Sequence, residues 1–320
     1  MNREILIDLY RKRGFSEEKT SDAINQVFQL EVFLSHNALT LTTAEEKDIE
    51  EYVDLLIVEK KNNLETILAL ARYFYVINRQ NIYIYFTKLL GGLGVLENIE
   101  SRVKEFQGEQ IRHRIFDDFL KPPLGTKKED IPEYTKVLMK KLEANLDEKS
   151  YCKILAGNNH LVPREAMEAE KKLYEKSESL DTYLKERHQR KVAELQEYCD
   201  QKKVWYEQVI TQEVVDFVKK NQEILSATRQ GDILYVTKIP YEPDKYIKEE
   251  DQIMKRYYAC HCTFAREAIL KNDDVPYRWC YCSGGFAKFP FEVILDRELD
   301  VTVLKSALKG DDICRFAIKI

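Results

Sequence analysis

The chain ends in VTVLKSALKGDDICRFAIKI, from Val301 to Ile320, and this stretch decides the fold of its C-terminal part. Two runs rich in β-branched and apolar residues flank Lys309-Gly310-Asp311-Asp312, which favours a turn, so the stretch predicts a β-hairpin. Along the second run, alternation places Cys314 on the same face as Phe316 and Ile318. We therefore interpret Cys314 as a core residue, because a free cysteine packs as a small hydrophobe.

A further strand and several helices are expected upstream of this hairpin. Residues 233–239 are dense in β-branched and aromatic side chains and end at Pro240, which predicts a strand. Residues 130–230 are rich in charged residues and carry apolar residues at helical spacing, which predicts mostly helix. The C-terminal part is therefore expected to contain an antiparallel sheet flanked by helices.

The N-terminal part has the pattern of a helical bundle. Apolar residues recur there at helical spacing, and Thr43-Ala44-Glu45-Glu46 predicts a capping box at the start of one helix. Lys121-Pro122-Pro123-Leu124-Gly125 can continue neither a helix nor a central strand. We predict an α+β protein with a helical bundle domain at 1–120, a linker at 121–132 and an α+β domain at 133–320.

Composition places the chain among ordinary soluble globular proteins. Its 320 residues are 33% charged and 44% hydrophobic, and the formal net charge is −5. That charge conflicts with a basic nucleic-acid binder, so we do not expect a nucleic-acid partner. No apolar run approaches the roughly 18 residues that span a bilayer, and the start lacks the apolar core of a secretory signal. We expect a cytoplasmic protein without a membrane partner.

Cysteine is the residue type that points most directly to chemistry. Most of the seven cysteines lie near the C-terminus, in the motifs Tyr258-Ala-Cys260-His261-Cys262 and Arg278-Trp-Cys280-Tyr-Cys282. A reducing compartment favours metal-binding or catalytic cysteines over disulfides. Each motif is predicted to close an extended, aromatic-rich run and to precede a helix, the first capped by Thr263 and the second covering Phe286–Leu295.

One interpretation of these motifs is a zinc site. Cys260, Cys262, Cys280 and Cys282 would supply four thiolates, which satisfy a closed tetrahedral site. In an extended strand, however, neighbouring residues point to opposite faces, so one metal could meet only one cysteine of each pair, and His261 could then replace a thiolate.

A second interpretation is a reactive thiol. A helix N-terminus favours a thiolate, and Cys282 lies just before Ser283-Gly284-Gly285, where glycines would let a ligand approach backbone N–H groups. His261 or His160, the latter in a polar loop, would act as its base. A third interpretation is that all these cysteines only pack in the core, where cysteine is common. The sequence leaves the three interpretations open.

The chain from about residue 150 resembles a family of uncharacterised bacterial proteins that carry the same paired-cysteine motifs. The C-terminal part, with Gly310, Asp311, Cys314 and Phe316, is also similar to the four-vinyl-reductase domain and to the L-2-amino-thiazoline-4-carboxylic acid hydrolase family. The first similarity implies a small-molecule-binding domain. The second implies hydrolysis of a cyclic C–N bond.

We therefore predict a small-molecule-binding protein whose cysteine-lined pocket holds zinc. Its ligand, of unknown identity, would meet Ser283, Gly284, Gly285, Arg266 and Arg278. The first alternative is a thiol-dependent hydrolase of the thiazoline-carboxylate type. The second is a helical module that contacts a protein or DNA, and assembly into a homo-oligomer stays open.

Overall fold

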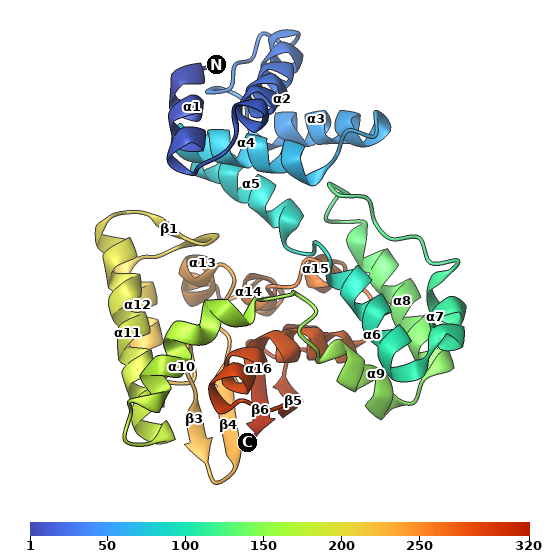
Figure 1. Ribbon diagram of the computed structural model, residues 1–320, viewed down its shortest axis with the longest axis vertical. Coiled ribbons are helices and arrows are strands. Elements are labelled where there is room, and N and C mark those ends of the chain that lie inside the picture. Colours follow the sequence, from blue (N-terminus) through green and yellow to red (C-terminus); the bar gives the residue numbers. More distant parts are fainter. The chain divides into compact units, whose positions relative to one another are not determined.

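The computed structural model describes residues 1–320, and the chain divides by its internal contacts into two units (Figure 1). The first unit comprises Met1–Leu93 and Pro122–Lys127, and the second comprises Gly94–Lys121 and Lys128–Ile320. The first division thus falls near residue 93, whereas the sequence suggested 120. Gly94 adopts a left-handed conformation with φ 76° and is the N-cap of α6 (Val95–Gln107), the first helix of the second unit.

The first unit is a bundle of helices around an apolar core. Its helices are α1 (Arg3–Lys12), α2 (Glu17–Ser35), α3 (Glu46–Val58), α4 (Leu64–Val76) and α5 (Gln80–Leu90). The side chains of Leu30, Ile67 and Phe86 are fully buried in this core. The predicted capping box at Thr43 is wrong by two residues, because Glu45 and Asp48 form the box that starts α3.

The predicted linker folds back onto the first unit. Gly125 has φ 93°, and a Cβ added to it would lie 2.6 Å from the side chain of Val53. Asn62 donates a hydrogen bond of 2.7 Å from Nδ2 to the carbonyl of Leu124. Pro122–Lys127 is therefore held by the helices of the first unit, although its composition predicted an open linker.

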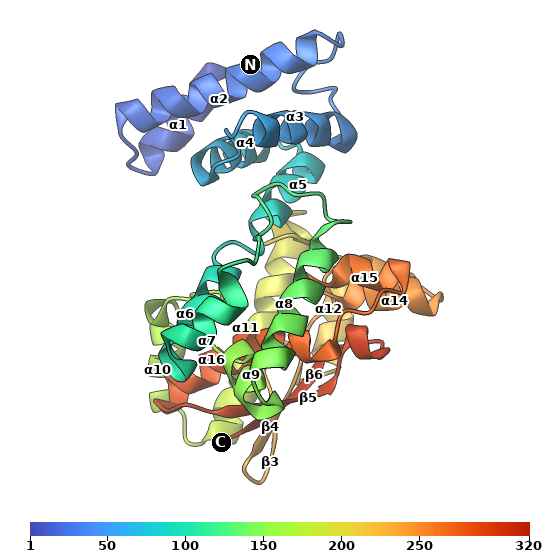
Figure 2. The same cartoon turned by 90° about the vertical axis from the view of Figure 1, so that its right-hand side faces the viewer.

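The second unit begins with helices that pack against one another (Figure 2). These are α6 (Val95–Gln107), α7 (Glu109–Phe116), α8 (Ile131–Asn145) and α9 (Glu148–Leu155). A loop then leads to the short 3-10 helix η1 (Arg164–Met167), α10 (Glu168–Glu175) and the long α11 (Leu180–Asp200). A two-stranded antiparallel ribbon, β1 (Val204–Trp205) and β2 (Gln208–Val209), precedes α12 (Gln212–Lys219).

The C-terminal half of this unit contains a four-stranded antiparallel sheet. Its strands are β3 (Thr228–Gln230), β4 (Ile233–Thr237), β5 (Asp300–Lys305) and β6 (Arg315–Lys319), in the order β3-β4-β6-β5. Leu234 pairs with Ile318, and Val236 pairs with Phe316. The predicted strand at 233–239 and the terminal hairpin are confirmed, and Cys314 is buried as predicted.

The segment between β4 and β5 contains the cysteine motifs. It forms α13 (Pro243–Lys248), α14 (Gln252–Ala259), α15 (Arg266–Lys271), the 3-10 helix η2 (Tyr277–Cys280) and α16 (Tyr281–Leu295). A third 3-10 helix, η3 (Ala307–Lys309), joins β5 to β6. Helix α16 packs on the sheet (Figure 1), and the predicted α+β class is confirmed. None of the helices combines the length and the apolar character that crossing a membrane requires.

Candidate functional site

The two cysteine pairs lie on or beside helices. Cys260 directly follows α14, and Cys262 lies in the turn before α15. Cys280 is the last residue of η2, and Cys282 lies in the first turn of α16, so η2 and α16 run on without a break. The extended runs that the aromatic residues predicted before each pair are therefore wrong.

A cap and tertiary contacts outweigh the strand propensity of the first motif. The side chain of Asp251 accepts a hydrogen bond of 2.9 Å from the N–H of Met254, which starts α14. The hydroxyl of Tyr257 then donates to Glu267 over 2.7 Å and ties α14 to α15. Thr263 caps neither helix, because α15 begins at Arg266 after Ala265 and has no side-chain cap.

The four motif cysteines fall into two adjoining hydrophobic clusters. Cys260 and Cys280 pack with Cys314 beneath the sheet, whereas Cys282 packs with Trp279 on the side of the N-terminal helices of the unit. Cys262 contacts both clusters, and the indole N–H of Trp279 donates to its Sγ over 3.2 Å.

Burial keeps these thiols protonated at neutral pH. It raises the pKa of Cys262 and of Cys282 to about 12, and it raises the pKa of Cys260 and Cys280 well above the ordinary value. No group of three or more His, Cys, Asp or Glu side chains is arranged to hold a metal ion. Zinc binding therefore stays a prediction of the motif spacing alone.

His160 meets Cys282 across the fold. Its Nε2 lies 3.7 Å from the sulfur of Cys282, and its ring packs edge-on against Phe286 with centroids 5.4 Å apart. His160 follows Asn159, which is fully buried and donates from Nδ2 to the carbonyls of the last turn of α9. Desolvation and the ammonium of Lys238 lower the pKa of His160, so the imidazole is neutral at pH 7.

His261 is engaged elsewhere. Its Nε2–H donates to the carbonyl of Ile239 over 2.6 Å, and its ring edge packs on Tyr241. Burial, and then the charge of Lys238, lower the pKa of His261 well below the usual value. The structure thus brings Cys282 and His160 together but directs His261 to the backbone after β4.

Lys238, one residue beyond β4, is the cation of this region. Its Nζ donates to the hydroxyl of Ser283 over 3.2 Å and lies 5.3 Å from the ring centroid of Phe286. The backbone N–H of Lys238 donates to the carbonyl of Cys314, which holds Lys238 in place just beyond the end of β4. Sequence reasoning missed Lys238, because a single lysine at the end of an apolar strand carries no signal of its own.

The two glycines after Ser283 serve packing within α16. A Cβ on Gly285 would lie 2.3 Å from the carbonyl oxygen of Gly157, so only glycine lets α16 approach the loop that carries His160. A Cβ on Gly284 would lie 3.3 Å from the side chain of Val301. The space that these glycines leave is thus occupied by the protein itself.

Residues 235–320 match the model of a Family of unknown function (DUF6144). The matched segment begins within β4 and includes Lys238, both cysteine motifs, α16 and the terminal hairpin. The loop that carries His160 lies outside it. Neither the curated proteins nor the solved structures contain a match to this chain.

The two arginines of the motifs bind carboxylates of the protein. Arg266 is buried, forms an ion pair with Glu242, and lies between the rings of Tyr241 and Tyr257, at 4.5 and 3.9 Å from their centroids. Arg278 pairs with Glu148 over 2.6 Å. Both predicted ligand-binding residues therefore tie helices together in this structure.

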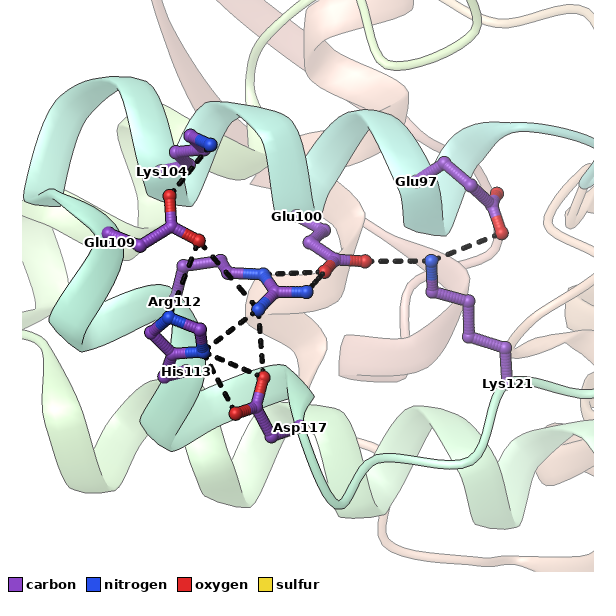
Figure 3. Close-up of polar contacts among 8 residues, drawn as sticks. All are labelled: Glu97, Glu100, Lys104, Glu109, Arg112, His113, Asp117 and Lys121. Atoms are coloured by element: carbon purple, nitrogen blue, oxygen red, sulfur yellow. Dashed lines mark hydrogen bonds and ion pairs between the residues drawn. The ribbon is translucent and has the colours of Figure 1, made fainter.

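A second concentration of charge lies where α6 meets α7 (Figure 3). A hollow of about 330 Å³ there is lined by Glu97, Glu100, Ser101, Lys104, Glu109 and Arg112. Arg112 contacts Glu100, Glu109 and Asp117, and Lys121 bridges Glu97 and Glu100. Each cation of this network already has a carboxylate partner, so the network clamps α7 and residues 117–121 to α6.

Proposed function

We propose that the second unit binds a small anionic molecule at a site formed by His160, Lys238, Cys282, Ser283 and Phe286, which we call the Lys238 site. One observation carries the proposal. The ammonium of Lys238 is partly buried and contacts a hydroxyl and an aromatic ring, but it has no carboxylate partner.

The neighbouring groups indicate that this positive charge is not compensated. The charge of Lys238 lowers the pKa of His160, of His261 and of the Cys282 thiol, and no carboxylate contributes to the pKa shift of any of these three groups. Arg266, the other buried cation nearby, is by contrast neutralised by Glu242. Buried charges are normally paired, so an unpaired one that touches solvent favours an anionic ligand.

The exposure of the site supports access by a ligand. His160 and Phe286 are exposed, and Lys238 and Ser283 are partly exposed. Ser283 accepts from Lys238 through its oxygen, so its own O–H can donate to a second acceptor. A charge-assisted hydrogen bond to Lys238 would contribute about 1.5–3 kcal/mol to binding. Ser283 is thereby the predicted ligand-binding residue that this proposal retains.

Lys238→Met tests the proposal, with Lys171→Met as the matched control. Lys171 is also partly buried, but it pairs with Asp296 on another part of the unit. The full chain is titrated with sodium acetate against sodium chloride at constant ionic strength, and binding is followed by calorimetry and by the melting temperature. We expect saturable acetate binding in the native protein and in Lys171→Met. Binding that persists in Lys238→Met would refute the proposal.

A second candidate function is a thiol-dependent hydrolase of the thiazoline-carboxylate type, which was predicted from the sequence and which the comparisons with known proteins do not show. The observation that favours it is the distance of 3.7 Å between Sγ of Cys282 and Nε2 of His160. In this role Cys282 is the nucleophile and His160 its base, and Lys238 would meet the substrate carboxylate. Because the thiol is neutral, proton transfer to His160 must accompany attack.

Hydrolysis of L-2-amino-thiazoline-4-carboxylate is the assay for this candidate. Cys282→Ser should abolish turnover, whereas Cys314→Ser, which changes another buried thiol near the sheet, should retain it. Equal activity in both variants would refute a catalytic role for Cys282. The predicted zinc is tested separately by elemental analysis of protein purified without chelator, where about one zinc per chain would support it.

A further inference from the structure

The Lys238 site presents an aromatic ring to solvent next to its cation. Phe286 lies on α16 and is 44% exposed, although it stands one helical turn beyond the buried Cys282. The edge-on contact with His160 and the ammonium of Lys238 take up part of its ring, at 5.4 and 5.3 Å. The rest of the phenyl ring has no aromatic partner.

We propose that the ligand of the Lys238 site is a planar, unsaturated ring that carries one carboxylate. The carboxylate binds Lys238 and Ser283, and the ring packs on Phe286 and His160. This inference rests on the proposed anion binding and names the class of anion. The observation that carries it is a juxtaposition: Nζ of Lys238, a cation without a carboxylate partner, lies 5.3 Å from the ring centroid of the exposed Phe286.

The donor set fits a carboxylate better than a phosphate. The site offers one ammonium and one hydroxyl, and His160 adds no charge because its imidazole is neutral. A phosphate that carries up to two negative charges is usually met by several cations or by a cluster of backbone N–H groups. The start of α16 offers no such cluster, since the N–H of Tyr281 already donates to carbonyls of η2.

The walls of the site fit a flat ring better than an aliphatic chain. Aromatic rings prefer offset or edge-on contacts with centroids about 4.5–7 Å apart, and Phe286 and His160 already form one such pair. A ligand ring would extend this arrangement on the exposed side of Phe286. The polarisable sulfur of Cys282 lies 3.7 Å from Nε2 of His160 and supports that ring from within the protein.

The experiment compares four probes on the full-length protein by calorimetry. Benzoate has the ring and the charge, cyclohexanecarboxylate has a saturated ring, acetate has only the charge, and benzamide has only the ring. We expect benzoate to bind about 3–10-fold more tightly than cyclohexanecarboxylate, which matches one aromatic contact. Benzamide should show no saturable binding.

Two variants assign the effect to Phe286. Phe286→Leu should remove the preference for benzoate over cyclohexanecarboxylate, whereas Phe286→Tyr should keep it. Phe106→Leu is the matched control, because Phe106 is 40% exposed on α6 and also has cations over its ring. Arg102 lies 5.0 Å and Lys153 5.6 Å from the ring centroid. The melting temperature of each variant is measured first. Because these rings are exposed, the substitutions should leave the melting temperature close to that of the native protein.

The outcomes separate the two proposals. If all three carboxylates bind equally, or if inorganic phosphate binds more tightly than benzoate, the ring-carboxylate class is wrong and anion binding stands. If none of the carboxylates binds, the proposed function fails as well. A preference for benzoate that depends on Phe106 and not on Phe286 would overturn the assignment to the Lys238 site.

Discussion

Gly285→Ala should force α16 away from the loop that carries His160. The added Cβ would lie 2.3 Å from the oxygen of Gly157 and 2.6 Å from the carbonyl of Ala156. Both are backbone atoms, which cannot rotate away as a side chain would. Because ordinary contact begins near 3.4 Å, the helix or the loop must move by about 1 Å.

The magnitude follows from two opposing effects. Overpacking of this kind costs about 1–3 kcal/mol, and the better helix propensity of alanine returns about 1 kcal/mol inside a helix. We expect Gly285→Ala to lower the free energy of unfolding of the second unit by about 0.5–2 kcal/mol. Gly284→Ala is the matched control, because its Cβ would lie 3.3 Å from side-chain atoms of Val301, which can adjust. That change should be neutral or slightly stabilising.

Tryptophan fluorescence during urea unfolding measures the effect in the right unit. The two tryptophans of the chain, Trp205 and Trp279, are both buried in the second unit, so their signal reports its unfolding alone. In a thermal melt, 1 kcal/mol should correspond to about 2–4 °C for a unit of this size. If Gly285→Ala and Gly284→Ala have the same urea midpoint, the overlap reasoning is wrong.

Three further predictions concern other contacts of the second unit. Burial alone would raise the pKa of Glu223, but the hydrogen bonds that it accepts from Arg315 (2.7 Å) and the opposite charges lower it, so its stabilisation is present above pH 4.5 and is lost as pH falls through the folded pKa. Glu223→Gln should cost about 2 kcal/mol at pH 7 in urea unfolding, and this cost should shrink as pH falls through the folded pKa; a pH-independent cost would contradict this. Iodoacetamide at pH 8 should modify the partly exposed Cys199 first and Cys282 about a thousandfold more slowly, because burial raises the pKa of Cys282 to about 12. If mass spectrometry finds Cys282 labelled early, Cys282 is not buried as described. Arg266→Met should lower the free energy of unfolding by about 2 kcal/mol, because Glu242 keeps only its salt bridge to Lys245 and the guanidinium between Tyr241 and Tyr257 is lost. A change below about 1 kcal/mol would show that the Arg266–Glu242 pair is dispensable.

Local signals in the sequence were sufficient for β4, β5 and β6, but not for β1, β2 and β3, which lie in the stretch predicted as mostly helix. Alternating apolar residues around Gly310 predict the pairing of β5 with β6, and the β-branched run before Pro240 predicts β4. In each of these strands, the alternation of core-facing and outward-facing residues can be recognised within a few residues of sequence. The order β3-β4-β6-β5 depends on contacts across the whole second unit, so no local pattern could give it.

The cysteine motifs show where local signals fail. Tyr257, Tyr258 and Trp279 favour strands by propensity, yet all three belong to helical segments. Asp251, whose side chain caps α14, is a residue type typical of a helix start, but the aromatic residues alone carried the strand prediction. Placing the pairs on strands left their orientation toward one metal open, so the zinc interpretation rested on the spacing of the motifs alone.

The division of the chain was misjudged for a similar reason. Pro122-Pro123-Leu124-Gly125 has the composition of a linker, but composition does not reveal that Gly125 packs on Val53. The less conspicuous Gly94 begins the second unit as the N-cap of α6. Both the position of Pro122–Lys127 and the boundary between the units thus depend on contacts between residues far apart in sequence.

The buried thiols and the unpaired lysine form one electrostatic arrangement. Cys282 is only 4% exposed, and desolvation raises its pKa by more than Lys238 and the side chain of Asn159 lower it. The thiols are therefore neutral and cannot serve as counter-ions. The imidazoles of His160 and His261 are neutral for the same reason. With no anion on the protein side, the charge of Lys238 is left to be balanced from solvent, and on this ground we propose an anion as the ligand of the Lys238 site.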